Sequence, residues 1–318
     1  MSSNIEGHVI VLAGGLSPER DVSLRSGRRV ADALRVAGVE AEVRDVDASL
    51  LTALVDHRPA CVIPLLHGAT GEDGAIRDVI GALGIPYVGS GPSACRASFD
   101  KPVASALVGA AGVSVPPSVA LPHATFRELG ATAVLDAVVG RLGLPLMVKP
   151  TRGGSSLGAS VVRSAAALPS AMVAAFAYGD TALIERFISG TEVAVSVLDD
   201  GSGPRALPVV EIVPDGGFYD YGARYTAGAT EFFVPARLSP EVLASCAEAA
   251  VSVHRVLGLS DWSRVDLIID AAGIPWFLEV NVAPGMTETS TYPQAVGAAG
   301  LDLGALTAGL VAQAISRS

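Results

Sequence analysis

Two carboxylates, an amide and a guanidinium occur at alternating positions of the segment RVDLIIDAAGIPWFLEVN, residues 264–281. Oxygen ligands of this kind bind hard divalent cations, and proteins typically hold Mg²⁺ by one or two carboxylates together with substrate phosphates. The alternation is typical of two antiparallel strands, in which every second side chain lies on the same face. We therefore expect one face of a hairpin to carry Asp266, Glu279, Asn281 and the neighbouring cation Arg264.

The turn of this hairpin is predicted at the tetrapeptide DAAG. Such a turn would pair Ile269 with Ile274 and place Phe277 opposite Asp266. The apolar side chains on the other face, among them Leu278, would then point into a core. A solvated outer face is the alternative, but the loop APGMT that follows is an unusual exit for an exposed edge.

A glycine- and serine-rich loop, TRGGSSLG at residues 151–158, offers successive backbone N–H groups with little side-chain obstruction. Such loops can cradle phosphate groups, although the tip of a plain hairpin has the same composition. Lys149 closes the apolar run LPLMV before this loop, where a buried ammonium needs an anionic partner. Lys101 opens a predicted helix, at the end where the helix dipole disfavours a cation. Both lysines are therefore candidates for phosphate binding.

Polar residues also follow the predicted strands of the N-terminal part. The segment GGLSPERDVS turns from a strand into a helix with Glu19 at its mouth, although the helix dipole alone also favours an acidic residue there. His67 follows the apolar run CVIPLL, and the tripeptide GSG follows IPYV. Ligands of open α/β sheets bind beyond the carboxyl ends of the strands. This edge of the sheet is therefore a candidate site.

The elements that must position these residues differ between the two halves of the chain. The first hundred residues alternate short β-branched runs with amphipathic stretches, the pattern of βαβ units around a parallel sheet. Strands are expected at HVIVLAGG, AEVRDVD, CVIPLLHG and IPYVGSG, and helices at residues 21–37, SLLTALVDHR and EDGAIRDVIGALG.

The composition changes near residue 98. A helix at 101–111, the proline-rich connection VSVPPSVALP and a second helix are expected before a hairpin in LPLMVKPTRGGSSLGASVV. TALIERFI, TEVAVSVLDD and LPVVEIVP are predicted strands, and FYDYGARYTAGATEF a long surface loop. Helices from Pro240 to Leu257 and near 302–315 complete the chain.

The bulk composition excludes some classes of protein. The 318 residues carry a formal net charge of −10 and only 22 basic residues without a marked cluster, which argues against a nucleic-acid partner. No basic leader precedes the first apolar run, and no apolar stretch approaches the about 18 residues that cross a bilayer. We therefore expect a cytoplasmic protein without a membrane partner. Cys61, Cys95 and Cys246 are expected to be buried thiols.

Taken together, the motifs resemble those of the D-alanine:D-alanine ligase family of the ATP-grasp superfamily, in the same order and over nearly the whole chain. The matching segments are Gly14 to Leu24, His67 to Gly74, Tyr87 to Gly91, Lys149 to Gly158, Phe218 to Tyr225, Arg264 to Asp266 and Glu279 to Thr287. The resemblance implies an α/β and α+β architecture, the ATP-grasp fold, in which an open parallel α/β domain precedes two α+β domains that clasp ATP. The expected domains are 1–97, 98–188 and 189–318.

The resemblance also implies which residues bind ATP and metal. The implied ATP-binding residues are Lys101, Lys149, Ser156, Glu185, Glu192 and Arg224. In this set the lysines contact phosphates, and the two glutamates hold the adenine and the ribose. Asp266, Glu279 and Asn281 are implied to bind two Mg²⁺ ions, which Mn²⁺ could replace.

The implied catalytic residues surround the first amino acid. Glu19 would hold its amino group, and Ser155 and Tyr225 would link to Glu19 across a closed loop. Arg264 and the N–H of Gly285 would stabilise the transition state. Because the chemistry must exclude water, residues 215–231 are the candidate closing loop.

The implied substrate-binding residues are His67 at the first subsite, Ser290 at the carboxylate of the second amino acid, and Thr291 beside it. The sequence departs from the commonest family pattern at Thr291, where Leu or Met is usual, and this bears on which second substrate is accepted. Arg224 stands for the usual Lys, Gly222 for a usual Glu, and Ala69-Thr70 for Arg-Gly. Arginine can also neutralise a phosphate, but its geometry differs from that of lysine.

The activity that the resemblance implies is the ATP-dependent joining of two D-amino acids, D-Ala with D-Ala, through an acyl phosphate, for peptidoglycan precursors. One alternative is a specialised ligase whose second substrate is D-Ser, D-lactate or another amine. The other is a non-catalytic ATP-binding homologue. We expect small-molecule substrates and a homodimer.

Overall fold

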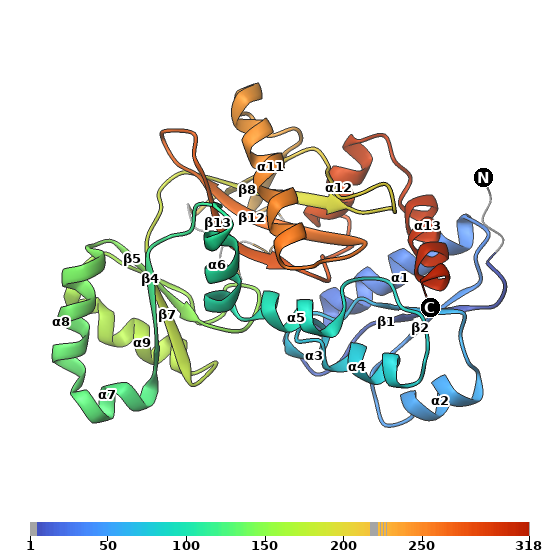
Figure 1. Cartoon of the computed structure of the whole chain (residues 1–318), viewed down its shortest axis with the longest axis horizontal. Helices are drawn as coiled ribbons and strands as arrows, with labels where there is room; N and C mark the ends of the chain where they lie inside the picture. The colour runs from blue at the N-terminus through green and yellow to red at the C-terminus, as the bar shows by residue number, and fades with distance from the viewer. Residues whose placement is uncertain (1–4, 217–221, 223, 225, 227, 318) are drawn as a thin grey trace.

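The computed structural model describes residues 5–216, 222, 224, 226 and 228–317. Within these residues the strands form three separate sheets. Figure 1 shows the N-terminal sheet and the sheet that contains β4, β5 and β7 toward opposite ends of the molecule, with the largest sheet between them.

The N-terminal sheet forms as the alternation of apolar runs and amphipathic stretches predicts. Its parallel strands are β1 (Val9–Leu12), β2 (Ala41–Arg44) and β3 (Cys61–Pro64), in the order β2-β1-β3. Every side chain of β1 is buried, Val9 and Val11 in one core and Ile10 and Leu12 in another, because both faces of the sheet are covered. The helices of this part are α1 (Arg20–Val36), α2 (Leu50–Asp56), α3 (Ala69–Glu72) and α4 (Ala75–Ala82).

The fourth predicted strand, IPYVGSG, pairs with β3 only at one parallel bridge, between Val62 and Tyr87. Val62 donates to the Pro86 carbonyl and accepts from the N–H of Val88, both at 2.9 Å. The next bond of this ladder would need an N–H at Pro64, which proline lacks. The prediction of a full strand over IPYVGSG was therefore wrong, because only this bridge forms.

The second sheet confirms the hairpin predicted around the glycine-rich loop. Its antiparallel strands are β4 (Ser118–Pro122), β7 (Thr181–Arg186), β5 (Leu146–Pro150) and β6 (Ser160–Val162), in that order. We expected β4 to be a connection, but an edge strand tolerates terminal proline. One core joins the sheet to α7 (His123–Leu129), α8 (Ala131–Leu142) and α9 (Leu168–Phe176).

The largest sheet has the order β11-β10-β8-β12-β13, with β9 beside β8. The strands are β8 (Thr191–Leu198), β9 (Arg205–Ala206), β10 (Val210–Pro214), β11 (Thr230–Phe233), β12 (Trp262–Ile269) and β13 (Pro275–Asn281). Apolar side chains on one face pack on α5 (Pro92–Phe99), α6 (Lys101–Ala110) and α11 (Pro240–Val256). The other face of β12 carries Arg264 and Asp266. The three cysteines are buried and free, as expected.

The turn of the β12–β13 hairpin differs from the predicted one. Ile269 pairs with Pro275, not with Ile274, so the turn has one more residue than DAAG. The Asp270 carboxylate accepts the N–H groups of Ala272 at 2.9 Å and Ile274 at 3.0 Å. These side-chain bonds stabilise the longer turn.

A β-bulge then returns Glu279 to the face on which the sequence predicted it. The register shifts after Asp266, so that Glu279, and not Phe277, lies directly opposite Asp266. Phe277 is buried in the core with Leu267, whereas Leu278, expected in the core, lines a cavity. The expected pairing was wrong, but the two carboxylates do share one side of the hairpin.

The last two helices complete the core of the N-terminal sheet. In α12 (Thr291–Ala298) and α13 (Leu303–Ser316), Tyr292 and Leu310 belong to the same buried cluster as Val9 and Val30. Figure 1 shows α13 beside α1. Among the described residues no single helix is long and apolar enough to span a membrane, and α12 with α13 would be so only as a pair bent by 102°. The predicted domain boundaries stay predictions.

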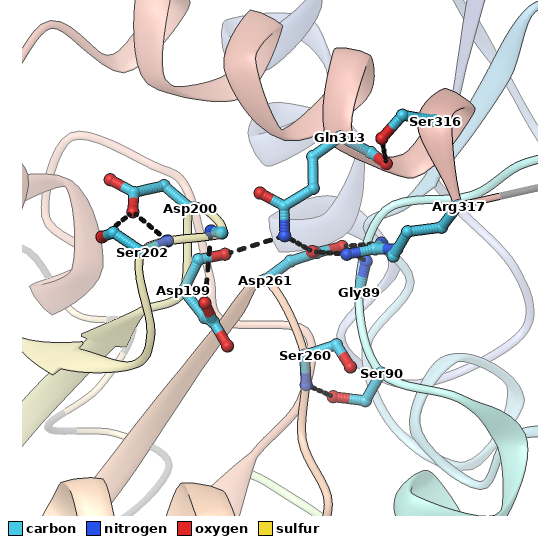
Figure 2. Close-up of polar contacts among 11 residues, drawn as sticks. Gly89, Ser90, Asp199, Asp200, Ser202, Ser260, Asp261, Gln313, Ser316 and Arg317 are labelled. Carbon is cyan, nitrogen blue, oxygen red and sulfur yellow. Dashed lines mark hydrogen bonds and ion pairs between the residues drawn. The ribbon is translucent and has the colours of Figure 1, made fainter.

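A buried carboxylate, Asp261, joins three parts of the chain directly before β12 (Figure 2). It accepts the N–H of Gly89 at 2.6 Å, the guanidinium of Arg317 at 2.5 and 2.9 Å, and the amide of Gln313 at 3.3 Å. Its own backbone has a φ of 64°, an uncommon conformation that these bonds hold in place. The charge is tolerated because each oxygen is bonded and a guanidinium neutralises it.

Replacing Arg317 by Gln is expected to lower the free energy of unfolding by about 2 kcal/mol, because the Asp261 carboxylate stays buried without its cation. The Arg317 side chain is itself 40% exposed, so the expected loss lies below the range that is typical when a fully buried ion pair is broken. The matched control is Arg205→Gln, whose partner Asp200 is 39% exposed, with an expected loss below about 1 kcal/mol. Urea unfolding followed by circular dichroism measures both, and equal losses would contradict the prediction.

Candidate active site

Two cavities lie on the open face of the largest sheet. The larger has a volume of about 390 Å³, and the smaller, toward the N-terminal part, a volume of about 240 Å³. Both are lined by a common set of residues, here called the shared wall: Lys101, Gly153, Gly154, Ile212, Arg224, Asp266 and Glu279. The cavities therefore meet at two carboxylates and two cations.

Lys101 connects the shared wall to the glycine-rich loop. Its Nζ lies 3.2 Å from Glu279 Oε2 and donates to the Gly153 carbonyl at 2.7 Å. Asp100 caps this end of α6 by accepting the N–H of Val103. A cation at the start of the helix is thus tolerated because it is bonded to groups of the site.

Asp266 and Glu279 lie directly opposite each other on adjacent strands, where like charges repel. Arg264 offsets one of them, because its Nε and Nη2 bind Asp266 Oδ1 and Oδ2 at 2.7 and 2.8 Å. The other is paired with Lys101. Each carboxylate of the hairpin face therefore has its own cation.

Several cations outweigh the effect of burial on Glu279. Burial raises the pKa of Glu279, but Lys101, Arg224, Lys149 and Arg264 bring that pKa down to about 2. Glu279 is therefore a carboxylate at neutral pH.

The predicted metal set fits an ion that is shared with phosphates. In the described part of the chain, no group of three or more His, Cys, Asp and Glu side chains is placed to hold a metal. Asp266, Glu279 and the amide oxygen of Asn281 are hard donors of the kind that Mg²⁺ takes from proteins, while phosphates supply further ligands. Asn281 lies opposite Arg264, and its Oδ1 accepts the N–H of Ala283 at 2.8 Å.

The loop 151–158 contributes to both cavities. Ser155 and Ser156 have φ values of 54° and 56°, uncommon for residues with a side chain. Ser155 lines the smaller cavity and Ser156 the larger. A Cβ on Gly154 would lie 3.2 Å from Glu19 Oε1, so the glycine lets the loop approach that carboxylate closely.

Lys149 and Glu192 line the larger cavity. The Nζ of Lys149 lies 2.6 Å from Oε1 of Glu185, which does not line either cavity. Burial raises the pKa of Glu192 to about 7, although Arg224 acts in the opposite direction. Near neutral pH the Glu192 carboxyl can therefore both donate and accept hydrogen bonds.

Sequence reasoning missed an ion pair in the larger cavity. Glu211 of β10 accepts from Nε and Nη2 of Arg237 at 2.9 and 2.7 Å. The Arg237 guanidinium also lies 3.5 Å from the ring centroid of Phe233. The available signal was the single Glu within the apolar strand LPVVEIVP, because a buried carboxylate needs a partner.

The smaller cavity brings together acidic residues and a histidine from the N-terminal part. Glu19 precedes α1 and is buried, and His67 follows β3. Burial lowers the pKa of His67 to about 4 despite Glu19, and no described residue forms a hydrogen bond with its Nε2. Glu72 was not singled out from the sequence. It accepts the N–H of Gly68 at 2.9 Å, and burial raises its pKa to about 7.

The loop from β13 to α12 borders the smaller cavity. A Cβ on Gly285 would lie 2.8 Å from Ser290 Oγ, so a larger residue would force this loop to shift. Ser290 accepts the N–H of Thr287 at 3.0 Å and does not cap α12 with its side chain. Thr291 is buried at the first turn, and among the described residues its hydroxyl has no backbone partner. An uncapped helix start with nearby hydroxyls suits an anion.

The structure thus brings most of the predicted residues into one site. Those that line only the smaller cavity are Glu19, His67, Ser155, Arg264, Asn281, Gly285, Ser290 and Thr291. Tyr225 lies outside the described residues, as does part of the predicted closing loop 215–231. The end of that predicted loop forms the strand β11, paired with β10, because its alternating residues extend the sheet.

Comparisons with known proteins identify the family of this chain. The sequence model described as D-ala D-ala ligase C-terminus matches residues 107–312. A D-alanine–D-alanine ligase of Bordetella petrii is 41% identical over 97% of this chain and 92% of its own length. Another, of Anaeromyxobacter sp. (strain K), is 42% identical over 95% and 94%.

Two solved structures show the same fold. The VanG D-Ala:D-Ser ligase from Enterococcus faecalis superposes with a TM-score of 0.82 at 30% identity, over 96% of this chain and 98% of that one. The D-alanine–D-alanine ligase from Bacillus anthracis complexed with ATP has a TM-score of 0.79 at 25% identity, over 98% of each chain. The fold is therefore the ATP-grasp fold that the motifs predicted. By sequence and by structure, the chain belongs to the D-alanine–D-alanine ligase family.

Proposed function

We propose that this protein is an ADP-forming ligase that joins D-Ala to D-Ala for peptidoglycan precursor synthesis. One observation carries the proposal: a larger and a smaller cavity meet at the shared wall, where Lys101, Asp266 and Glu279 lie together. A reaction between a nucleotide phosphate and an amino acid needs this juxtaposition of two binding sites.

ATP would occupy the larger cavity with its phosphates toward the shared wall. Lys101 and Lys149 supply positive charge there, and Ser156 with the glycine-rich backbone supplies N–H and hydroxyl donors. The Lys149 ammonium would exchange its contact with Glu185 for a phosphate. Glu192, and by resemblance Glu185, would bind the adenosine part.

The first D-amino acid would occupy the smaller cavity. Glu19 would bind its ammonium group, since the glycines at positions 68 and 154 leave both carboxylate oxygens accessible. Neutral His67, with its unpartnered Nε2, would lie at the same subsite. The substrate carboxylate would then point toward the shared wall and attack the γ-phosphorus of ATP, giving an acyl phosphate and ADP.

Asp266, Glu279 and Asn281 would hold two Mg²⁺ ions, or Mn²⁺, with the phosphates. These ions would supply charge neutralisation of the transferring group. The bidentate contact with Asp266 fixes the position of the Arg264 guanidinium, and this cation and the Gly285 N–H would stabilise developing negative charge.

The second D-amino acid would bind between the first subsite and α12. Ser290 and the start of α12 would bind its carboxylate, because the helix dipole favours an anion there. Its amine would attack the acyl carbon and expel phosphate. Residues 215–231 would close over the acyl phosphate, with Arg224 at the phosphates and Tyr225 linked to Ser155.

D-Ser as the second substrate is the competing proposal. The buried Thr291 hydroxyl at the smaller cavity favours it, because a hydroxymethyl group would find a partner there. The likeness to the D-Ala:D-Ser ligase agrees with this possibility. We also propose a cytoplasmic homodimer, which the family resemblance supports.

An ATP-turnover screen tests the function. Phosphate release is measured with D-Ala, D-Ser and D-lactate, alone and in pairs, and products are identified by mass spectrometry. D-Ala-D-Ala as the main product supports the proposal. ATP binding without phosphate release under every condition would instead support a non-catalytic homologue.

Glu279→Gln is expected to reduce turnover by about 10³-fold or more, because it removes a charged ligand and a partner of Lys101. The melting temperature should change little. Glu42→Gln, which alters an exposed carboxylate far from the shared wall, is the control and should retain full activity. Activity of Glu279→Gln within a few-fold of the original at ordinary Mg²⁺ would sink the metal assignment.

Thr291→Leu is expected to raise the preference for D-Ala over D-Ser at the second subsite by about fivefold, since one methylene-sized contact is worth on the order of 1 kcal/mol. The measurement is kcat/KM for each second substrate in both proteins. Thr132→Leu, at an exposed position of α8 that lines neither cavity, serves as the control. An unchanged D-Ala to D-Ser ratio would show that Thr291 does not contact the substrate.

A further inference from the structure

Arg77 is a fully buried cation in α4, away from both cavities. Its Nη1 donates to the Gly71 carbonyl, but its Nε and Nη2 have no hydrogen-bond partner among the described residues. No carboxylate of the described residues forms an ion pair with it, and the adjacent Asp78 is paired with Arg96. A buried guanidinium without a counter-charge is strongly unfavourable.

A second unpartnered donor lies beside it. Trp262, at the start of β12, is buried, and within the described part of the chain its Nε1 has no hydrogen-bond partner. A Cβ placed on Gly89 would lie 3.6 Å from Arg77 Nη2, 3.8 Å from Trp262 Nε1 and 3.9 Å from Arg77 Nε. Apart from Gly89 itself and its two chain neighbours, no atom of the described residues is nearer to that point. Three N–H donors therefore surround one position next to Gly89.

The free edge of Arg77 is the edge that binds anions elsewhere in this protein. Arg264 uses Nε and Nη2 to bind Asp266, and Arg237 uses the same two nitrogens to bind Glu211. In Arg77 this edge faces Gly89, which has no side chain that could accept a hydrogen bond from it. The Nε and Nη2 of Arg77 are therefore placed as in a guanidinium–carboxylate pair, but no described carboxylate lies opposite them.

Asp261 does not supply the missing charge. Figure 2 shows its carboxylate bonded to Arg317, Gln313 and the N–H of Gly89. The Arg317 guanidinium already neutralises it. The N–H of Gly89 is already bonded to Asp261. Gly89 therefore lies between the Asp261 carboxylate and the Arg77 guanidinium.

We propose that the converging N–H groups of Arg77 and Trp262 beside Gly89 form a buried binding site for a small monovalent anion, with chloride as its simplest occupant. Water fits this site less well, because a water molecule accepts about two hydrogen bonds and must also donate its own hydrogens. Three converging donors, one of them cationic, instead require a ligand that only accepts. The enclosed position beside a backbone favours a monatomic ion over a carboxylate.

An anion at this position would connect α4 of the N-terminal part to the start of β12. Two residues further along, β12 carries Arg264, and four residues further, Asp266. The expected consequence is greater stability of this junction rather than direct participation in the reaction.

The solution test measures the melting temperature as sodium chloride replaces sodium gluconate at constant ionic strength. Above its dissociation constant, chloride should raise the melting temperature by about 2 °C for each tenfold increase in concentration. Two variants remove donors: Arg77→Gln removes the cation, and Trp262→Phe removes the indole N–H while keeping a ring. Arg96→Gln removes an exposed arginine nearby and is the matched control.

Chloride dependence that is lost in Arg77→Gln or in Trp262→Phe, and kept in Arg96→Gln, supports the site. If Arg77→Gln does not fold, Trp262→Phe alone decides. The proposal is overturned by no chloride dependence in the unaltered protein, by dependence retained in the donor variants, or by an equal loss in the control. Crystals grown with bromide provide the direct readout, an anomalous peak beside Gly89, and its absence at high bromide would also overturn the proposal.

Discussion

Two carboxylates placed opposite each other on adjacent strands are the constraint on which the site depends. Asp266 and Glu279 would repel one another in the closed hairpin if they stood alone. Arg264 compensates the first within its own strand, whereas Lys101 must reach the second from α6. The apolar packing of α6 on the largest sheet, through Ala104 and Val108, brings Lys101 to Glu279. The same cations are then available to phosphates.

The boundary of the smaller cavity depends on contacts between distant parts of the chain. The Met286 N–H donates to Ser26 Oγ at 3.0 Å, which fixes the β13–α12 loop against α1. Asp261 joins Gly89 to α13 in the same way. Since α12 and α13 also share a core with the N-terminal sheet, the N-terminal and C-terminal walls of the cavity are held in a fixed relation. A site between two substrates needs such rigidity.

Local patterns predicted much of this architecture. The alternation of Arg264, Asp266, Glu279 and Asn281 was sufficient to predict their common face, because strand periodicity acts within a few residues. The register was not predictable in the same way. It depends on the Asp270 side chain, which lengthens the turn, and on the bulge at Leu278.

Interactions between distant segments account for the other features of the structure that the sequence did not predict. The partner of Glu211 is Arg237, and no local pattern connects them. Glu72 lies within a glycine-rich motif that does not single it out as a site residue. Its raised pKa results from burial that only the folded chain provides. The packing of α13 on the N-terminal sheet likewise depends on the return path of the chain.

The proposed reaction depends on one step, in which the carboxylate of one amino acid attacks the γ-phosphate of ATP across the shared wall. Oxygen-18 in the carboxylate of D-alanine tests this most directly. If an acyl phosphate forms and the second amine then expels phosphate, one labelled oxygen passes from D-alanine to inorganic phosphate, which phosphorus NMR or mass spectrometry detects. Inorganic phosphate without the label, or label found in AMP, would contradict the account.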